Sequence, residues 1–153
     1  MSKVKRPGIG VGVMILKENK ILLGKRNNDP LKADSLLHGE GTWTMPGGKV
    51  GFKEPLHTAA IREVIEETNI KAKNLELMSI NNDVTHDNHF ITVGFLCREF
   101  EGEPITKEPD EITEWKWFSL TKLPEKIFPP SKKMIENYIK KTIYVEGDDH
   151  AND

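Results

Sequence analysis

One segment of the chain, residues 56–68, constrains the fold more than any other. It runs without glycine or proline, and its apolar residues Ile61, Val64 and Ile65 recur at helical spacing. A helix is therefore expected here, with Ile61 and Ile65 anchored in a hydrophobic core. Such an anchored helix holds the side chains of its other face on a rigid element.

The other face of this predicted helix is acidic. Glu63, Glu66 and Glu67 are related as i, i+3 and i+4, which brings three carboxylates close together. Like charges at this spacing destabilise a helix unless a positive charge lies among them. Hard divalent cations prefer oxygen ligands, and Mg²⁺ typically takes one or two carboxylates together with water and phosphate oxygens. Ala59 and Ala60 fall near this face one turn earlier, so we expect open space there for a phosphate group.

The remaining elements predict a mixed α/β layer fold. Apolar and β-branched stretches bounded by turn residues predict strands at residues 8–16, 21–26, 75–80, 90–100 and 115–120. Ser131 is expected to cap a second helix, whose apolar residues run from Met134 to Ile143. Residues 27–42 are polar and contain proline and glycine, which predicts a long loop.

The size and composition of the chain fit one ordinary globular domain. A chain of 153 residues, 37% of them hydrophobic, can bury a core without disulfides. We place this domain at residues 1–145 and predict that the acidic residues 146–153 are disordered.

The charge and cysteine content limit the partners and the compartment. With a net charge of −2, the chain lacks the basic excess expected of a protein that coats nucleic acid. With one cysteine, Cys97, and no apolar stretch long enough to span a bilayer, a cytoplasmic protein is expected.

The segment from Gly48 to Ile70 resembles the Nudix box. Asn69 stands where that family usually has glycine, and asparagine is the next most tolerant residue of the left-handed conformation. The resemblance extends to Trp43 and to residues 89–117, which are similar to MutT-type nucleoside triphosphate pyrophosphatases. It implies a Nudix-like α/β/α sandwich with a mixed β-sheet and two main helices. The other fixed positions of the motif are matched by Gly48, Glu54, Arg62, Glu63, Glu66 and Glu67.

The same resemblance implies a magnesium-dependent hydrolase, in which water activated among bound metal ions attacks a phosphorus atom. Manganese is expected to substitute for magnesium. Arg62 is expected to orient the carboxylates, with Glu54 as its partner. An acidic residue from a downstream loop is implied as a further ligand; Glu108 is the matching position, and Asp110 and Glu111 are its rivals. The implied ligands are the Gly48 carbonyl, Glu63, Glu66, Glu67 and Glu108.

Substrate choice in this family depends on residues outside the box. The chain lacks the marks of NADH pyrophosphatases, of many ADP-ribose hydrolases and of diadenosine polyphosphate hydrolases, which leaves nucleoside triphosphates, cleaved to monophosphate and pyrophosphate. The candidate substrate-binding residues are Lys25, Arg26, Trp43 and Lys132. Lys25 and Arg26 could instead end a strand in solvent, and Trp43 could fill the core. Lys132 stands where the 8-oxoguanine enzyme has a base-reading asparagine, so strict 8-oxo-dGTP specificity is not expected.

Two other functions stay open at this point. One is hydrolysis of ADP-ribose, which shares the box, and the other is a non-catalytic Nudix-like module that binds a nucleotide. The presence of every box carboxylate favours an enzyme. The expected partner is a small nucleotide, with no nucleic acid polymer and no membrane. The loop at residues 27–42 is a candidate pocket wall or homodimer contact.

Overall fold

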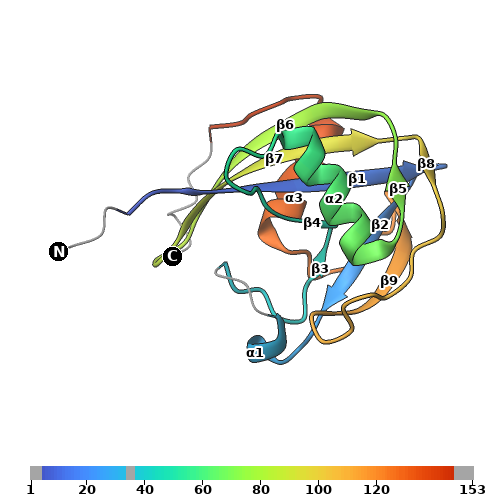
Figure 1. Ribbon diagram of the computed structural model, residues 1–153, viewed down its shortest axis with the longest axis horizontal. Coiled ribbons are helices and arrows are strands. Elements are labelled where there is room, and N and C mark those ends of the chain that lie inside the picture. Colours follow the sequence, from blue (N-terminus) through green and yellow to red (C-terminus); the bar gives the residue numbers. More distant parts are fainter. Residues whose placement is uncertain (1–4, 34–36, 147–153) are drawn as a thin grey trace.

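The structure is a computed structural model that describes residues 5–33 and 37–146. Runs of strands are separated by helices along this part of the chain (Figure 1). The elements are β1 (Gly8–Lys17), β2 (Lys20–Arg26), α1 (Pro30–Ala33), β3 (Trp43–Thr44), β4 (Gly47–Lys49), α2 (Leu56–Thr68), β5 (Lys71–Ala72), β6 (Leu75–Val84), β7 (His89–Cys97), β8 (Phe100–Glu101), β9 (Ile112–Ser119) and α3 (Pro129–Lys140).

A mixed sheet forms the centre of the described residues. Seven strands belong to it, in the order β3-β2-β1-β7-β6, with β4 paired to β1 and β9 paired to β2. The long strands β1 and β7 are parallel, and the other pairs are antiparallel. The β1–β2 connection is a tight turn in which Glu18 and Asn19 have φ values of 49° and 63°. Such a left-handed pair suits the twist of a hairpin.

Helices α2 and α3 cover opposite faces of this sheet (Figure 1). Alternation along β1 supplies both interfaces, because successive side chains of a strand point to opposite faces. Val13 and Ile15 pack in the cluster that contains Ala60 of α2. Met14 packs in the other cluster, with Met134 of α3. The predicted α/β/α sandwich with a mixed sheet and two main helices is therefore confirmed.

Helix α2 has the predicted bounds but buries a different face. Ala59, Ala60 and Val64 are fully buried in the core, whereas Ile65 is 37% exposed and Ile61 is half-buried. The prediction that Ile65 anchors the helix was wrong, and so was the expectation of open space above the alanines. Small alanine side chains let the helix pack closely against the sheet, which brings the acidic residues on the adjoining face near β4.

Helix α3 begins earlier than predicted. Pro129 and Pro130 occupy its first positions and Phe128 precedes them as the N-cap residue, because proline is pre-organised for a helix start. Ser131 is therefore not the cap; it is buried, and its Oγ accepts the Met45 N–H at 2.9 Å. The helix ends at Lys140, so Ile143 lies beyond it.

The predicted loop at residues 27–42 contains the short helix α1.

No helix of the described residues has the length and apolar character needed to cross a membrane. The tail predicted at residues 146–153 falls outside the described residues from position 147 onward. The domain boundary at residue 145 stays a prediction.

Candidate active site

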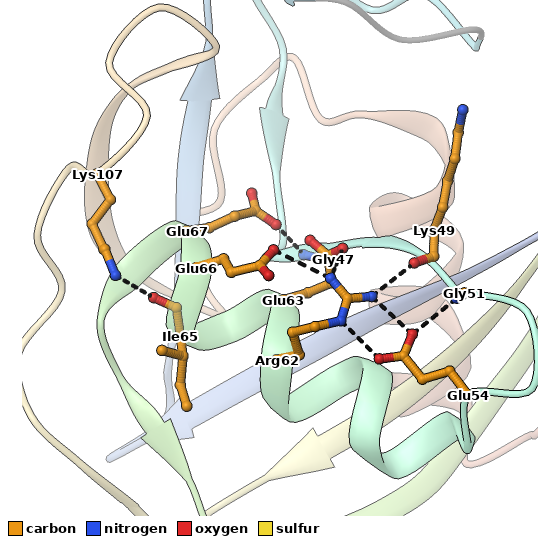
Figure 2. Close-up of polar contacts among 10 residues, drawn as sticks. All are labelled: Gly47, Lys49, Gly51, Glu54, Arg62, Glu63, Ile65, Glu66, Glu67 and Lys107. Atoms are coloured by element: carbon orange, nitrogen blue, oxygen red, sulfur yellow. Dashed lines mark hydrogen bonds and ion pairs between the residues drawn. The ribbon is translucent and has the colours of Figure 1, made fainter.

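A guanidinium group organises the acidic face of α2 (Figure 2). Arg62 donates through Nε and Nη2 to the two carboxylate oxygens of Glu54, at 2.7 and 2.9 Å. Its Nη1 donates to Glu63 at 2.9 Å and to Glu66 at 3.2 Å. These charge-assisted bonds offset the like-charge repulsion along the helix. The predicted pairing of Arg62 with Glu54 is present in the structure.

The same contacts fix the chain that precedes α2. Glu54 also accepts the Gly51 N–H at 2.9 Å, and the Lys49 carbonyl accepts from Arg62 Nη2 at 3.1 Å. The bond from Arg62, followed by the Gly51 amide, lowers the pKa of Glu54 to about 2. The helix, the loop and the end of β4 are therefore held as one unit.

Glu67 is the buried carboxylate of the site. Its side chain accepts the Gly47 N–H at 2.9 Å, and the residue is only 8% exposed. Burial raises the pKa of Glu67 well above its ordinary value, and the charges of Glu63 and Glu108 act in the same direction. Burial likewise raises the pKa of Glu63, against the opposing effect of Arg62. Two carboxyl groups that resist ionisation thus lie beside β4.

The glycines of β4 make this close approach feasible. A Cβ atom added at Gly48 would lie 2.5 Å from the carboxyl carbon of Glu63, and one at Gly47 would collide with the Val11 carbonyl of β1. Any side chain at these positions would displace the carboxylate or the strand. The predicted ligand residue Gly48 therefore lies directly against the predicted ligand Glu63.

The segment between β8 and β9 completes the acidic end of the site. The Ile105 N–H donates to the Thr68 carbonyl at 3.0 Å, and Lys107 Nζ donates to the Ile65 carbonyl at 3.2 Å (Figure 2). These bonds fasten the segment to the end of α2. Glu108 and Glu111 then both line the cavity beside the helix. The third rival, Asp110, is not among the residues that line it.

The cavity has a volume of about 550 Å³ and extends from the carboxylates to an apolar end. Arg26 lies at the apolar end, beside Phe128. It is buried, donates to the carbonyls of Gly39 at 3.1 Å and Ala33 at 2.8 Å, and lies over the Phe128 ring at 4.7 Å. It is therefore not a solvated strand end, and its two hydrogen bonds tie Ala33 and Gly39 to β2. Apolar side chains at this end include Ala33, Leu37, Ile112, Phe128 and Met134.

Three of the four residues predicted to bind substrate do not line this cavity. Lys25 is half-buried on β2, and its strand partners are Trp43 of β3 and Glu114 of β9. Trp43 packs edge-on against Phe118, with ring centroids 4.8 Å apart, and belongs to the core on the α3 side. Lys132 is exposed on α3. Arg26 alone of the four lies at the cavity.

The cavity also contains residues for which the sequence predicted no place in the site. Phe128 and Ser131 come from the start of α3, Thr44 from β3 and Phe90 from β7. The Pro129-Pro130 pair was a usable signal, since it moves the helix start and places Ser131, not Lys132, toward the sheet. Nothing in the local sequence distinguishes Thr44 or Phe90 from ordinary strand residues.

The donor chemistry of the acidic end fits a hard divalent cation. Among the described residues, no three Asp, Glu, His or Cys side chains converge closely enough to hold a metal ion in their present positions. Glu63 and Glu66 instead turn oxygens toward Arg62. Carboxylate oxygens and a nearby backbone carbonyl are the ligand types that Mg²⁺ prefers. Buried Glu67, whose charge is costly without a cation, is the structural feature that best fits such an ion.

Comparison with known proteins identifies the family. The model of the NUDIX domain matches residues 6–138, which is most of the chain. The chain therefore belongs to the NUDIX family, as the resemblance of residues 48–70 indicated, and is a pyrophosphohydrolase of that type.

Individual relatives carry different names. The chain is 33% identical over 136 residues to the ADP-ribose pyrophosphatase of Methanocaldococcus jannaschii, covering 88% of this chain and 74% of that protein. It is 32% identical over 124 residues to the NAD-capped RNA hydrolase NudC of Photorhabdus laumondii, covering 80% of this chain. The chain spans about half of the length of that second relative, 46%.

Solved structures show the same fold. A MutT NUDIX hydrolase from Burkholderia pseudomallei aligns with a TM-score of 0.78 and 30% identity, over 87% of this chain and 98% of the other. The MutT protein of Methanosarcina mazei aligns with a TM-score of 0.75 and 25% identity, over 91% and 98% respectively. The predicted similarity to MutT-type proteins is thus confirmed.

Proposed function

We propose that this protein uses a divalent cation, Mg²⁺ in the first place, to hydrolyse a phosphoanhydride bond in a nucleoside diphosphate derivative. The observation that carries the proposal is the buried carboxylate of Glu67. It is held by the Gly47 amide at one end of a cavity that Glu63, Glu108 and Glu111 also line. So many carboxylates around one cavity require a compensating positive charge when a polyphosphate enters.

In this proposal the residues of the chain hold the cation and provide a carboxylate that accepts a proton. Glu67 and Glu63, the carboxylates of this face that are least exposed to water, are the expected main ligands. Glu66, Glu108 and the Gly48 carbonyl are expected as further ligands. A bound divalent cation supplies neutralisation of phosphate charge and lowers the pKa of bound water. A carboxylate of the acidic face is proposed to accept the proton of the attacking water.

Arg62 acts as a positioning residue in this proposal. Its bonds to Glu54 and to the Lys49 carbonyl hold the guanidinium in place. From there it hydrogen-bonds to Glu63 and Glu66, which restricts the rotamers of both side chains and fixes the direction of their remaining oxygens. At the other end of the cavity, the ring of Phe128 and the apolar side chains around it suit the flat face of a nucleobase.

Two substrate classes fit this chemistry, and a different observation supports each. Cleavage of nucleoside triphosphates to monophosphate and pyrophosphate is supported by the likeness to MutT-named structures. Cleavage of ADP-ribose is supported by the relative of that name, which is 33% identical. A shared requirement, a nucleoside attached to a diphosphate, defines the proposed class.

The test is turnover of a nucleotide panel with magnesium, with manganese and with chelator. Product identification separates monophosphate plus pyrophosphate from AMP plus ribose 5-phosphate. We expect turnover that requires the metal and stops in chelator. Nucleotide binding without turnover of any panel member would contradict the proposal and support a non-catalytic binding module.

A further inference from the structure

A second hollow continues from the catalytic cavity. Its volume is about 940 Å³, and it lies between the residues that lead into β1, the end of β4 and the β6–β7 connection. Lys49 and Phe90 line both spaces, so the two hollows meet at these residues. A substrate bound at the acidic end of the cavity therefore lies next to the second hollow.

The border between the two spaces is fixed by contacts already described. The Lys49 carbonyl accepts from Arg62, which also holds Glu63 and Glu66, while the Lys49 side chain extends away from the carboxylates (Figure 2). On the other side, the Phe90 ring packs on Gly8 so closely that a Cβ atom at Gly8 would collide with it. The ammonium group of Lys49 is thus tied to the catalytic machinery by its own backbone.

The second hollow concentrates positive charge in a chain whose net charge is −2. Lys5, Arg6 and Lys49 line it, against one carboxylate, Asp87. Within residues 5–33 and 37–146, none of these three cations forms an ion pair. Asp87 is turned to other groups, since it accepts from the Thr85 hydroxyl at 3.1 Å and lies 3.5 Å from His38 Nε2. Uncompensated cations in a concave surface attract an anionic ligand.

We propose that the second hollow binds a phosphate group carried by the substrate's second half, across the scissile anhydride from the nucleoside. This inference rests on the proposed function and names its substrate class: a nucleoside diphosphate linked to a phosphorylated sugar. A neutral terminal sugar makes no use of three unpaired cations. The nucleoside takes the other direction, toward Phe128, because the apolar end of the catalytic cavity suits a base.

Three probes with the same ADP-ribose core test the assignment. ADP-ribose is the reference, ADP-ribose 1″-phosphate adds a phosphate to the second sugar, and ADP-ribose 2′-phosphate adds the same charge to the adenosine half. We expect the KM for the 1″-phosphate to be at least roughly fivefold below that for ADP-ribose, because several modest ion pairs act together. No comparable gain is expected for the 2′-phosphate. The proposed function fails only if neither these probes nor any nucleoside triphosphate is hydrolysed. If the three probes bind without being hydrolysed, their Kd values from calorimetry in the same magnesium buffer decide the inference.

Matched variants locate the effect. Arg6→Gln should remove a large part of the advantage of the 1″-phosphate, measured as the ratio of its KM to that of ADP-ribose. Lys17→Gln removes the same charge at the opposite end of β1 and should leave that ratio as it is. Equal affinity for the three probes, or an equal gain from the 2′-phosphate, would overturn the proposal. So would an Arg6→Gln variant that keeps the full preference.

Discussion

At the scale of single residues, the carboxylates of the site differ in whether a positive charge contacts them. Arg62 contacts three carboxylates and one carbonyl. Its pairing with Glu54 was expected because the segment resembles the Nudix box. The burial of Glu67 was not readable in the same way. It depends on the Gly47 amide, which β1 and β4 bring to the helix from a distant part of the chain.

The sharpest residue prediction concerns Glu67→Gln. The amide oxygen of glutamine can still accept the Gly47 N–H, so the fold should survive, but the negative charge that attracts a cation is gone. We expect turnover to fall by at least roughly a hundredfold, equivalent to about 2.7 kcal/mol in the barrier. Steady-state kinetics at saturating magnesium measures this.

The stability of the same variant shows whether a lower turnover comes from the lost charge or from unfolding. Removing a buried charge should leave the melting temperature in chelator unchanged or raised, since ionised Glu67 is costly to bury and repels Glu63. Near-normal magnesium-dependent turnover of Glu67→Gln would contradict the assignment of the acidic face as the active site. A large loss of melting temperature would show that the turnover loss reflects unfolding.

A second residue prediction concerns Asn69, which departs from the family motif. The structure confirms its left-handed conformation, with φ 67° and ψ 9°, at the C-cap of α2. We expect Asn69→Gly to stabilise the protein by about 1 kcal/mol or less and to leave turnover unchanged, because glycine adopts this conformation without a Cβ penalty. Lys141→Gly, at the left-handed cap of α3, is the matched comparison for chemical denaturation. A large activity loss in folded Asn69→Gly would reveal a functional role for the side chain.

At the scale of elements, long periodic segments were predictable and very short ones were not. Helix α2 is long enough for its helical repeat to be recognised, and β1 and β2 are long enough to be recognised as apolar runs bounded by turn residues. Strands β3, β5 and β8 have two residues each, so they carry no period and form only because distant partners pair with them. The buried face of α2 was misjudged because close packing on the sheet selected alanines over isoleucines, a preference that hydrophobicity alone does not reveal.

The link between α3 and β3 gives an element-scale prediction. Ser131 Oγ accepts the buried Met45 N–H at 2.9 Å. Ser131→Ala leaves that amide without a partner, which should cost about 1–3 kcal/mol in the free energy of unfolding. Ser119→Ala, which loses a solvent-exposed hydrogen bond, should cost much less. Urea denaturation of both variants makes the comparison, and equal small losses would argue against the bond as a link between the layers.

The link between α2 and the loop before it predicts a pH dependence. The pKa of Glu54 is lowered from 4.5 to about 2 by Arg62 and the Gly51 amide. A lowered folded-state pKa contributes stability that is present above pH 4.5 and is lost as the pH falls toward 2. Glu54→Gln should therefore destabilise the protein at pH 7 and differ progressively less from the parent as the pH falls through this window. Thermal denaturation across pH measures the difference, with exposed Glu76→Gln as control; a pH-independent difference would contradict the assignment to charge.

At the scale of the whole molecule, the pattern of strands and helices predicted a mixed α/β layer fold, and the resemblance to the Nudix family implied the α/β/α sandwich with two main helices. The cavity was not predictable, because strands, helices and loops from many separated parts of the chain build it. The acidic helix, the strand β4, the segment after β8 and the start of α3 meet only through tertiary contacts. The sequence motif identified the acidic half of this cavity and left the half that contains Arg26 and Phe128 undefined.

The last prediction follows from the charge that this cavity assembles. Glu63, Glu67, Glu108 and Glu111 line one space, and each of the last two raises the pKa of Glu67. A cation that binds the folded protein and not the unfolded chain stabilises it by about 2.7 kcal/mol at a hundred times its Kd. For a domain of this size, that corresponds to a rise of roughly 5–10 °C in melting temperature. We expect MgCl₂ to produce such a rise and NaCl of equal ionic strength to produce little. The rise should be much smaller in Glu67→Gln; an equal rise in that variant would mean that the stabilising ion binds elsewhere.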